Sequence, residues 1–64
     1  SVEFLDATLA ELDRMAKDME EHRRSIAAID DPVIRQTRVK LEKFLEQIER
    51  QISSLKYFRT DMYE

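Results

Sequence analysis

The apolar residues of this 64-residue chain recur at alternating spacings of three and four. This is the period of an α-helix that packs along one seam against a neighbour. In the first half of the chain the stripe consists of Val2, Leu5, Leu9, Leu12, Ala16, Met19, Arg23 and Ile26. In the second half it consists of Ile34, Arg38, Leu41, Leu45, Ile48, Ile52, Leu55, Arg59 and Met62. The pattern predicts two long amphipathic helices, at about 2–29 and 32–63.

Helix-breaking residues occur at one place, in the segment Ile29-Asp30-Asp31-Pro32. Proline disfavours helix in the residue before it and suits the first turn of a new helix. Asp30 or Asp31 then serves as the N-cap, and an Asp30 cap would place Ile29 and Ile34 at the two ends of a hydrophobic staple. A turn at 30–31 is short enough to make the two helices antiparallel neighbours.

Folding the chain at this turn brings the two stripes into register. The expected apolar layers pair Ile26 with Ile34, Met19 with Leu41, Ala16 with Leu45, Leu12 with Ile48, Leu9 with Ile52, and Leu5 with Leu55. A one-residue error in the turn would rotate one stripe by about 100° and destroy this match. The sequence therefore predicts an all-α fold, an antiparallel two-helix hairpin of coiled-coil type that forms a single unit over 1–64.

Four further apolar residues, Met15, Ile29, Phe44 and Phe58, lie beside the seam at the heptad position called g. Each helix therefore carries an apolar face wider than a two-helix seam uses. A chain this small also needs a staple, a metal or a partner for stability. We expect the hairpin to dimerise into a four-helix bundle. Because the chain begins with serine, we expect it to be a piece of a longer protein.

Aromatic and methionine side chains form two groups that are candidates for a partner interface. Phe4, Tyr57, Phe58 and Tyr63 gather at the open end of the hairpin, and Met15, Met19 and Phe44 gather at mid-height. Core filling is the alternative explanation for Met19 and Phe44, whereas large apolar side chains outside a core tend to mark interfaces. The predicted interface residues are Phe4, Met15, Met19, Phe44, Tyr57, Phe58, Met62 and Tyr63.

Arginines interrupt both stripes, and the register places Arg23 and Arg38 in one layer. Such residues can extend outward and pair with nearby acids, here Glu20, Glu42 or Asp18. Alternatively, they can act as polar residues that fix register and partner choice. Arg59 faces Val2 at the open end and is expected to be exposed.

The composition argues against catalysis and against cofactor, metal or small-molecule sites. The chain has no glycine and no cysteine, and its one histidine, His22, follows no ligand pattern. Phosphate-binding loops need glycine, and no nucleophile motif is present. The absence of cysteine fits a reducing compartment, so a cytoplasmic or other intracellular location is expected. No apolar run is long enough for a membrane span.

The sequence thus predicts a protein–protein interaction or oligomerisation module whose partner is a second copy of itself or another helical protein. One alternative is a subunit, or a hairpin resembling a secretion chaperone, that folds only on a different protein. A second is a helical dimer that binds nucleic acid through arginines near the turn, Arg23, Arg24, Arg35 and Arg38. The formal net charge of −3 and the adjacent acids Glu20, Glu21, Asp30 and Asp31 argue against that second alternative.

Overall fold

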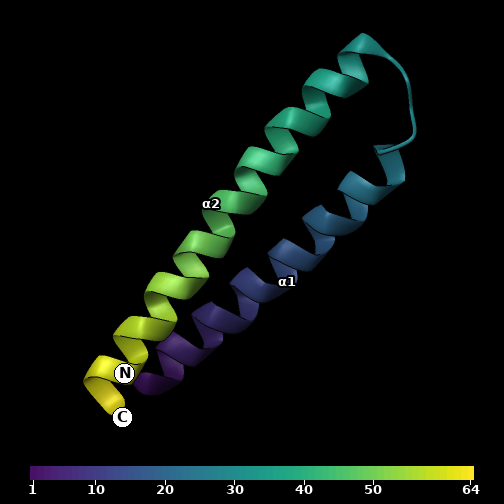
Figure 1. Ribbon diagram of the computed structural model, residues 1–64. Helices are drawn as coiled ribbons and strands as arrows, with labels where there is room; N and C mark the ends of the chain where they lie inside the picture. Colours follow the sequence, from purple (N-terminus) through teal and green to yellow (C-terminus); the bar gives the residue numbers. More distant parts are fainter.

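The computed structural model describes all 64 residues and consists of two helices, α1 (Val2–Ile26) and α2 (Pro32–Tyr63). The helices run antiparallel, so that the two termini lie at the same end of the molecule (Figure 1). The molecule measures 47 × 14 × 12 Å and its radius of gyration is 14.8 Å. A compact globular chain of this length would have a radius of gyration of about 11 Å. The predicted all-α antiparallel hairpin is confirmed, and its shape is a rod.

Helix α1 is shorter than predicted, because it ends at Ile26 rather than near residue 29. After this point the backbone tightens, with the Ala27 N–H donating to the Arg24 carbonyl at 3.3 Å and the Ile29 N–H donating to the Ile26 carbonyl at 3.2 Å. The connection therefore spans 27–31 instead of 30–31. Connections of two to five residues are usual between antiparallel helices, so the longer connection keeps the predicted arrangement.

Helix α2 begins at Pro32 and is capped by Asp31 rather than Asp30. The Asp31 carboxylate accepts hydrogen bonds from the backbone N–H groups of Val33 at 2.9 Å and Ile34 at 3.2 Å. With this cap the predicted staple between Ile29 and Ile34 is out of phase. An ion pair between Asp30 and Arg35, at 2.9 Å, links the corresponding positions instead.

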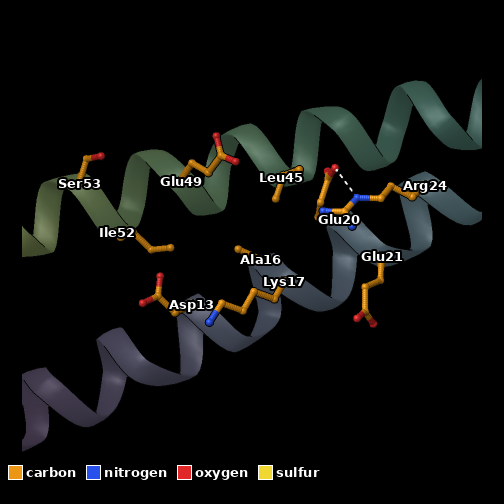
Figure 2. Close-up of a pocket in the computed structure, with 10 residues that line it drawn as sticks. All are labelled: Asp13, Ala16, Lys17, Glu20, Glu21, Arg24, Leu45, Glu49, Ile52 and Ser53. Carbon is orange, nitrogen blue, oxygen red and sulfur yellow. Dashed lines mark hydrogen bonds and ion pairs between the residues drawn. The ribbon is translucent and has the colours of Figure 1, made fainter. Parts of the chain in front are cut away.

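The two predicted stripes form the seam. All of the stripe residues from Val2 to Arg59 are half-buried or buried. Ala16, Leu45 and Ile52 lie between the helices at mid-length (Figure 2). Met62 is the exception, because α1 begins at Val2, level with Arg59, and nothing covers the last turns of α2; its side chain is 59% exposed.

Burial in the seam is shallow everywhere. Only Leu5 and Ile52 count as buried, each at 8% exposure, and no side chain is completely enclosed. A single neighbouring helix covers one strip of each rod, which leaves both edges of the seam open to water. The hairpin therefore holds a line of contacts rather than an enclosed core.

The Asp31 cap gives a direct test of how the turn is built. We expect Asp31→Ala to lower the free energy of unfolding by about 1 kcal/mol, because two backbone N–H groups of α2 lose their acceptor. Asp30→Ala is the matched control and should cost less than half of that, since the exposed pair with Arg35 contributes little. Urea unfolding followed by circular dichroism measures both, and equal losses would contradict the assignment of the cap.

Candidate functional site: the flanks of the seam

The two flanks of the seam differ in chemistry. At the nine e positions of the heptad, seven residues are charged: Asp6, Asp13, Glu20, Arg35, Glu42, Glu49 and Lys56. At the nine g positions none is Asp, Glu, Lys or Arg. In an antiparallel pair of helices, the e positions of both helices border one side of the seam and the g positions border the other. One side of the hairpin is therefore a charged flank, made of the seven residues above.

The opposite side exposes apolar side chains, and we call it the apolar flank. Met15, Phe44 and Phe58 occupy position g, Phe4 and Val33 the neighbouring position c, and Met62 the neighbouring position d. We include Ile29, which lies in the connection before α2, and Tyr57, which precedes Phe58. All of them are exposed, including Phe4 at 74% and Phe44 at 57%. A scattered apolar side chain on a surface is ordinary, but a group of large ones on a single side marks a contact surface.

Shallow hollows lie next to Phe44 on the apolar flank. One of about 510 Å³ is bordered by Leu12, Phe44 and Ile48 together with Gln47, Arg50 and Gln51. Another, of about 220 Å³, is bordered by Lys40, Lys43, Phe44 and Gln47. Phe44 thus stands as a ridge between two depressions at mid-height of the rod, and this shape suits interdigitation with the side chains of another helix.

The charged flank is held by ion pairs, of which Arg23 with Glu20 is the most sheltered. The guanidinium lies 2.6 Å from the Glu20 carboxylate, and both side chains are less than one-third exposed. Arg24 adds a longer contact to the same carboxylate at 3.4 Å (Figure 2). The hydrogen bond from Arg23 lowers the pKa of Glu20 to about 2, against some opposition from desolvation. Glu42 on α2 also attracts Arg23, so this arginine is drawn to acids on both helices.

The other two arginines of the stripe connect the helices. Arg59 bonds to Asp6 at 2.6 Å, and its hydrogen bond lowers the pKa of that carboxyl. Arg38 donates to the Ala27 carbonyl at 2.9 Å and so satisfies a backbone group left open at the end of α1. Side chains on a helix point toward its N-terminus, which explains why both arginines of α2 reach toward the turn.

These contacts settle one expectation about the arginines and correct another. Arg23 pairs with Glu20, as the outward-pairing alternative predicted, but Arg38 contacts the Ala27 carbonyl and none of the predicted acids. The role of both arginines in partner choice stays a prediction. Arg59 was expected to be exposed, but its side chain is 29% exposed and also lies 3.2 Å from Glu64. The acid Asp6, which lies one turn inward from Val2, holds it against the hairpin.

A hollow of about 540 Å³ lies on the charged side of the molecule, over Ala16, Leu45 and Ile52. Its rim carries both signs of charge: the acids are Asp13, Glu20, Glu21 and Glu49, and the bases are Lys17 and Arg24 (Figure 2). No group of three or more His, Asp or Glu side chains is arranged to hold a metal ion, and His22 is exposed. The one hydroxyl that borders the hollow is that of Ser53.

The four arginines near the turn are all engaged within the hairpin. Arg23 and Arg24 contact Glu20, Arg35 contacts Asp30, and Arg38 contacts the Ala27 carbonyl. Binding to nucleic acid requires cations that are available to phosphates. Arg24 and Arg35 nevertheless remain more than half exposed, so the nucleic-acid alternative stays a prediction.

Of the eight residues predicted to form the interface, seven are exposed and Met19 is half-buried in the seam. Six of the exposed seven belong to the apolar flank, and Tyr63 lies at an e position on the opposite side. Ile29 and Val33, both exposed beside the turn, belong to the flank but were not among the predicted interface residues. The heptad pattern had already placed Ile29 beside the seam, whereas Val33 lies at position c, which the difference between the e and g positions does not single out.

Comparison of the chain with protein-family models, curated protein sequences and solved structures finds no match. Neither α1 nor α2 has a stretch that is long and apolar enough to cross a membrane. The surfaces of the hairpin are thus the observations from which a function can be inferred.

The Glu20 ion pair makes the stability of the hairpin depend on pH. Because the pKa of Glu20 falls from its ordinary value of 4.5 to about 2, its contribution is complete above about pH 4.5 and is lost as the pH falls toward 2. The urea concentration at the midpoint of unfolding should therefore fall as the pH is lowered from 5 to 2.5. For the Glu20→Gln variant this midpoint should fall less steeply. Glu46→Gln, which changes an exposed acid without an ion pair, is the control and should follow the unmodified chain. A Glu20 carboxyl that titrates near 4.5 by NMR would contradict this account.

Proposed function

We propose that the hairpin is a protein–protein interaction module that self-associates through its apolar flank, so that two copies form a four-helix bundle. The observation that carries the proposal is the division of the surface into a charged flank and an apolar one. Ion pairs and exposed acids occupy the first. The second exposes three phenylalanines at 49% or more, and nothing within the chain covers them.

The energetics of the hairpin support a requirement for a companion chain. Only two residues are buried, so the favourable burial that a domain normally obtains from its core is small here. Full burial of a Phe or Met side chain contributes about 1.5–3 kcal/mol. These three side chains, Met15, Phe44 and Phe58, are 39%, 57% and 49% exposed, so a neighbour that covers them would add about 2–4 kcal/mol of stabilisation per chain.

The spacing along the apolar flank favours a second copy as that neighbour. Phe44 precedes Phe58 by two heptads within α2, so the apolar bands at the middle and at the open end lie about 21 Å apart, and Ile29 and Val33 form a third band beside the turn. Polar rows separate them, with Thr8 and Gln51 in one and His22 and Thr37 in the other. When a second copy is related to the first by a two-fold axis, each apolar band contacts an apolar band of the other copy and each polar row contacts a polar row. A symmetric dimer needs this self-complementarity.

Substitution of Phe44 tests the proposal. We expect Phe44→Glu to weaken self-association at least tenfold, because it removes a central apolar contact and places a charge in the interface. Val39→Glu is the matched control, since Val39 is also an exposed apolar residue of α2 but lies away from the apolar flank, and it should change the dissociation constant less than threefold. Sedimentation equilibrium of the two variants measures this difference.

Two results would contradict self-association through this flank. The first is equal weakening by both substitutions, which would place the contact elsewhere or show that association is unspecific. The second is an unmodified chain that stays monomeric and poorly helical at every concentration. That behaviour would indicate a hairpin that folds on a different protein.

A further inference from the structure

Charged residues along the two edges of the apolar flank have opposite signs. On the edge formed by α1 the residues at heptad position c include Glu11 and Asp18. On the edge formed by α2 the charged side chains that border the hollows at Phe44 are Lys40 at position c and Lys43 and Arg50 at position f. One long edge of the flank is thus mainly acidic and the other basic over the middle of the rod.

These opposite charges also lie at matching heights. Asp18 lies next to Met19 in the sequence, and Met19 shares a seam layer with Leu41. Lys40 and Lys43 lie on either side of Leu41 in the sequence, so they stand at about the height of Asp18. Glu11 precedes Leu12, whose layer contains Ile48, and Arg50 follows Ile48 by two residues. The two edges are nevertheless separated by the width of the hairpin, and no ion pair joins them within one chain.

The three cations on the α2 edge have no ion-pair partner in the hairpin, because none of the salt bridges includes Lys40, Lys43 or Arg50. On the α1 edge both acids contact Arg14, and the Arg14–Asp18 distance is 2.9 Å. All three of these side chains are more than half exposed, so the pairs contribute little and leave carboxylate oxygens open to a second donor. The α2 edge therefore offers unpaired cations, and the α1 edge offers acceptors.

Two arrangements bring apolar flanks face to face, and they differ in which edges meet. In the first arrangement the turns lie at opposite ends, and each helix packs on the same helix of the other copy, α1 on α1 and α2 on α2. The two acidic edges then face each other, and so do the two basic edges. If the turns lie at the same end, with the two-fold axis along the rod, α1 of each copy packs antiparallel on α2 of the other. In that arrangement Asp18 meets Lys40 and Lys43, and Glu11 meets Arg50.

Resting on the self-association proposed above, we infer that the partner surface accepts a second copy in this same-end arrangement. Opposite charges across an interface steer assembly, and like charges oppose the alternative orientation. The bands of the apolar flank also remain matched, because each level of the rod meets the same level of its copy. Phe44 of each copy then lies next to Met15 of the other, and Phe4 lies next to Tyr57 and Phe58 at the open end.

Spin-label distances measure the orientation directly. The chain has no cysteine, so Ala28→Cys places a single label in the turn and Glu46→Cys places one at mid-height on the far side. In the same-end dimer, pulsed dipolar spectroscopy on Ala28→Cys should give a distance below half of the 47 Å length of the rod. A distance close to that full length would overturn the inferred orientation but leave self-association intact. The Glu46→Cys label should show dipolar coupling between the two copies in either orientation. If no coupling is detected, the proposed self-association itself is overturned.

Charge reversal provides a second readout that depends on the edges. Asp18→Lys and Lys43→Asp should each weaken self-association severalfold, whereas an equimolar mixture should form heterodimers well above the statistical half, because both contacts then join opposite charges. Asp13→Lys and Lys56→Asp make the same changes of charge on the charged flank and are the matched control pair. Native mass spectrometry counts the heterodimers. An equal preference in the control mixture would show that net charge alone drives pairing and would overturn the role of the edges.

Discussion

Two packed rods can cover only one strip of each other, and this geometric constraint governs the whole molecule. Here that strip takes up the seam residues and leaves only Leu5 and Ile52 buried. The side chains beside the strip remain in water whatever their chemistry. Contact with water is favourable for the charged residues on that border, but it is unfavourable for the exposed side chains of Phe44 and Phe58. The exposed apolar flank is the consequence, and a companion chain is the simplest way to cover it.

The charged flank stabilises the hairpin in a way that complements the seam. The stripe arginines lie where an apolar side chain would otherwise stand, and each turns to the charged side to reach a carboxylate or a carbonyl. These contacts tie α1 to α2 at the open end through Asp6 and Arg59 and at the turn through Ala27 and Arg38. No comparable contact crosses the apolar flank. The side proposed to meet a partner is therefore also the side that intrachain polar contacts leave free.

The sequence predicted the stripes, the antiparallel pairing and the start of α2, because heptad periodicity and proline chemistry are local signals. It misplaced the end of α1, since a helix that stops without glycine or proline has no local marker in the sequence. It also missed that Asp6 holds Arg59, a contact between residues far apart in the sequence. It also did not predict that Met62 is exposed. Met62 lies beyond the start of α1, and the stripe of α2 alone does not show where α1 begins.

The central claim is that the hairpin exposes more apolar surface than it can cover alone and that a second copy covers it. The molar mass of the unmodified chain, measured by sedimentation equilibrium from nanomolar to high micromolar concentration with helicity recorded in parallel, tests this claim most directly. The account predicts a rise toward twice the monomer mass of 7.7 kDa, together with a gain in helicity and in resistance to urea. A fully helical and stable 7.7 kDa monomer throughout the range would contradict it.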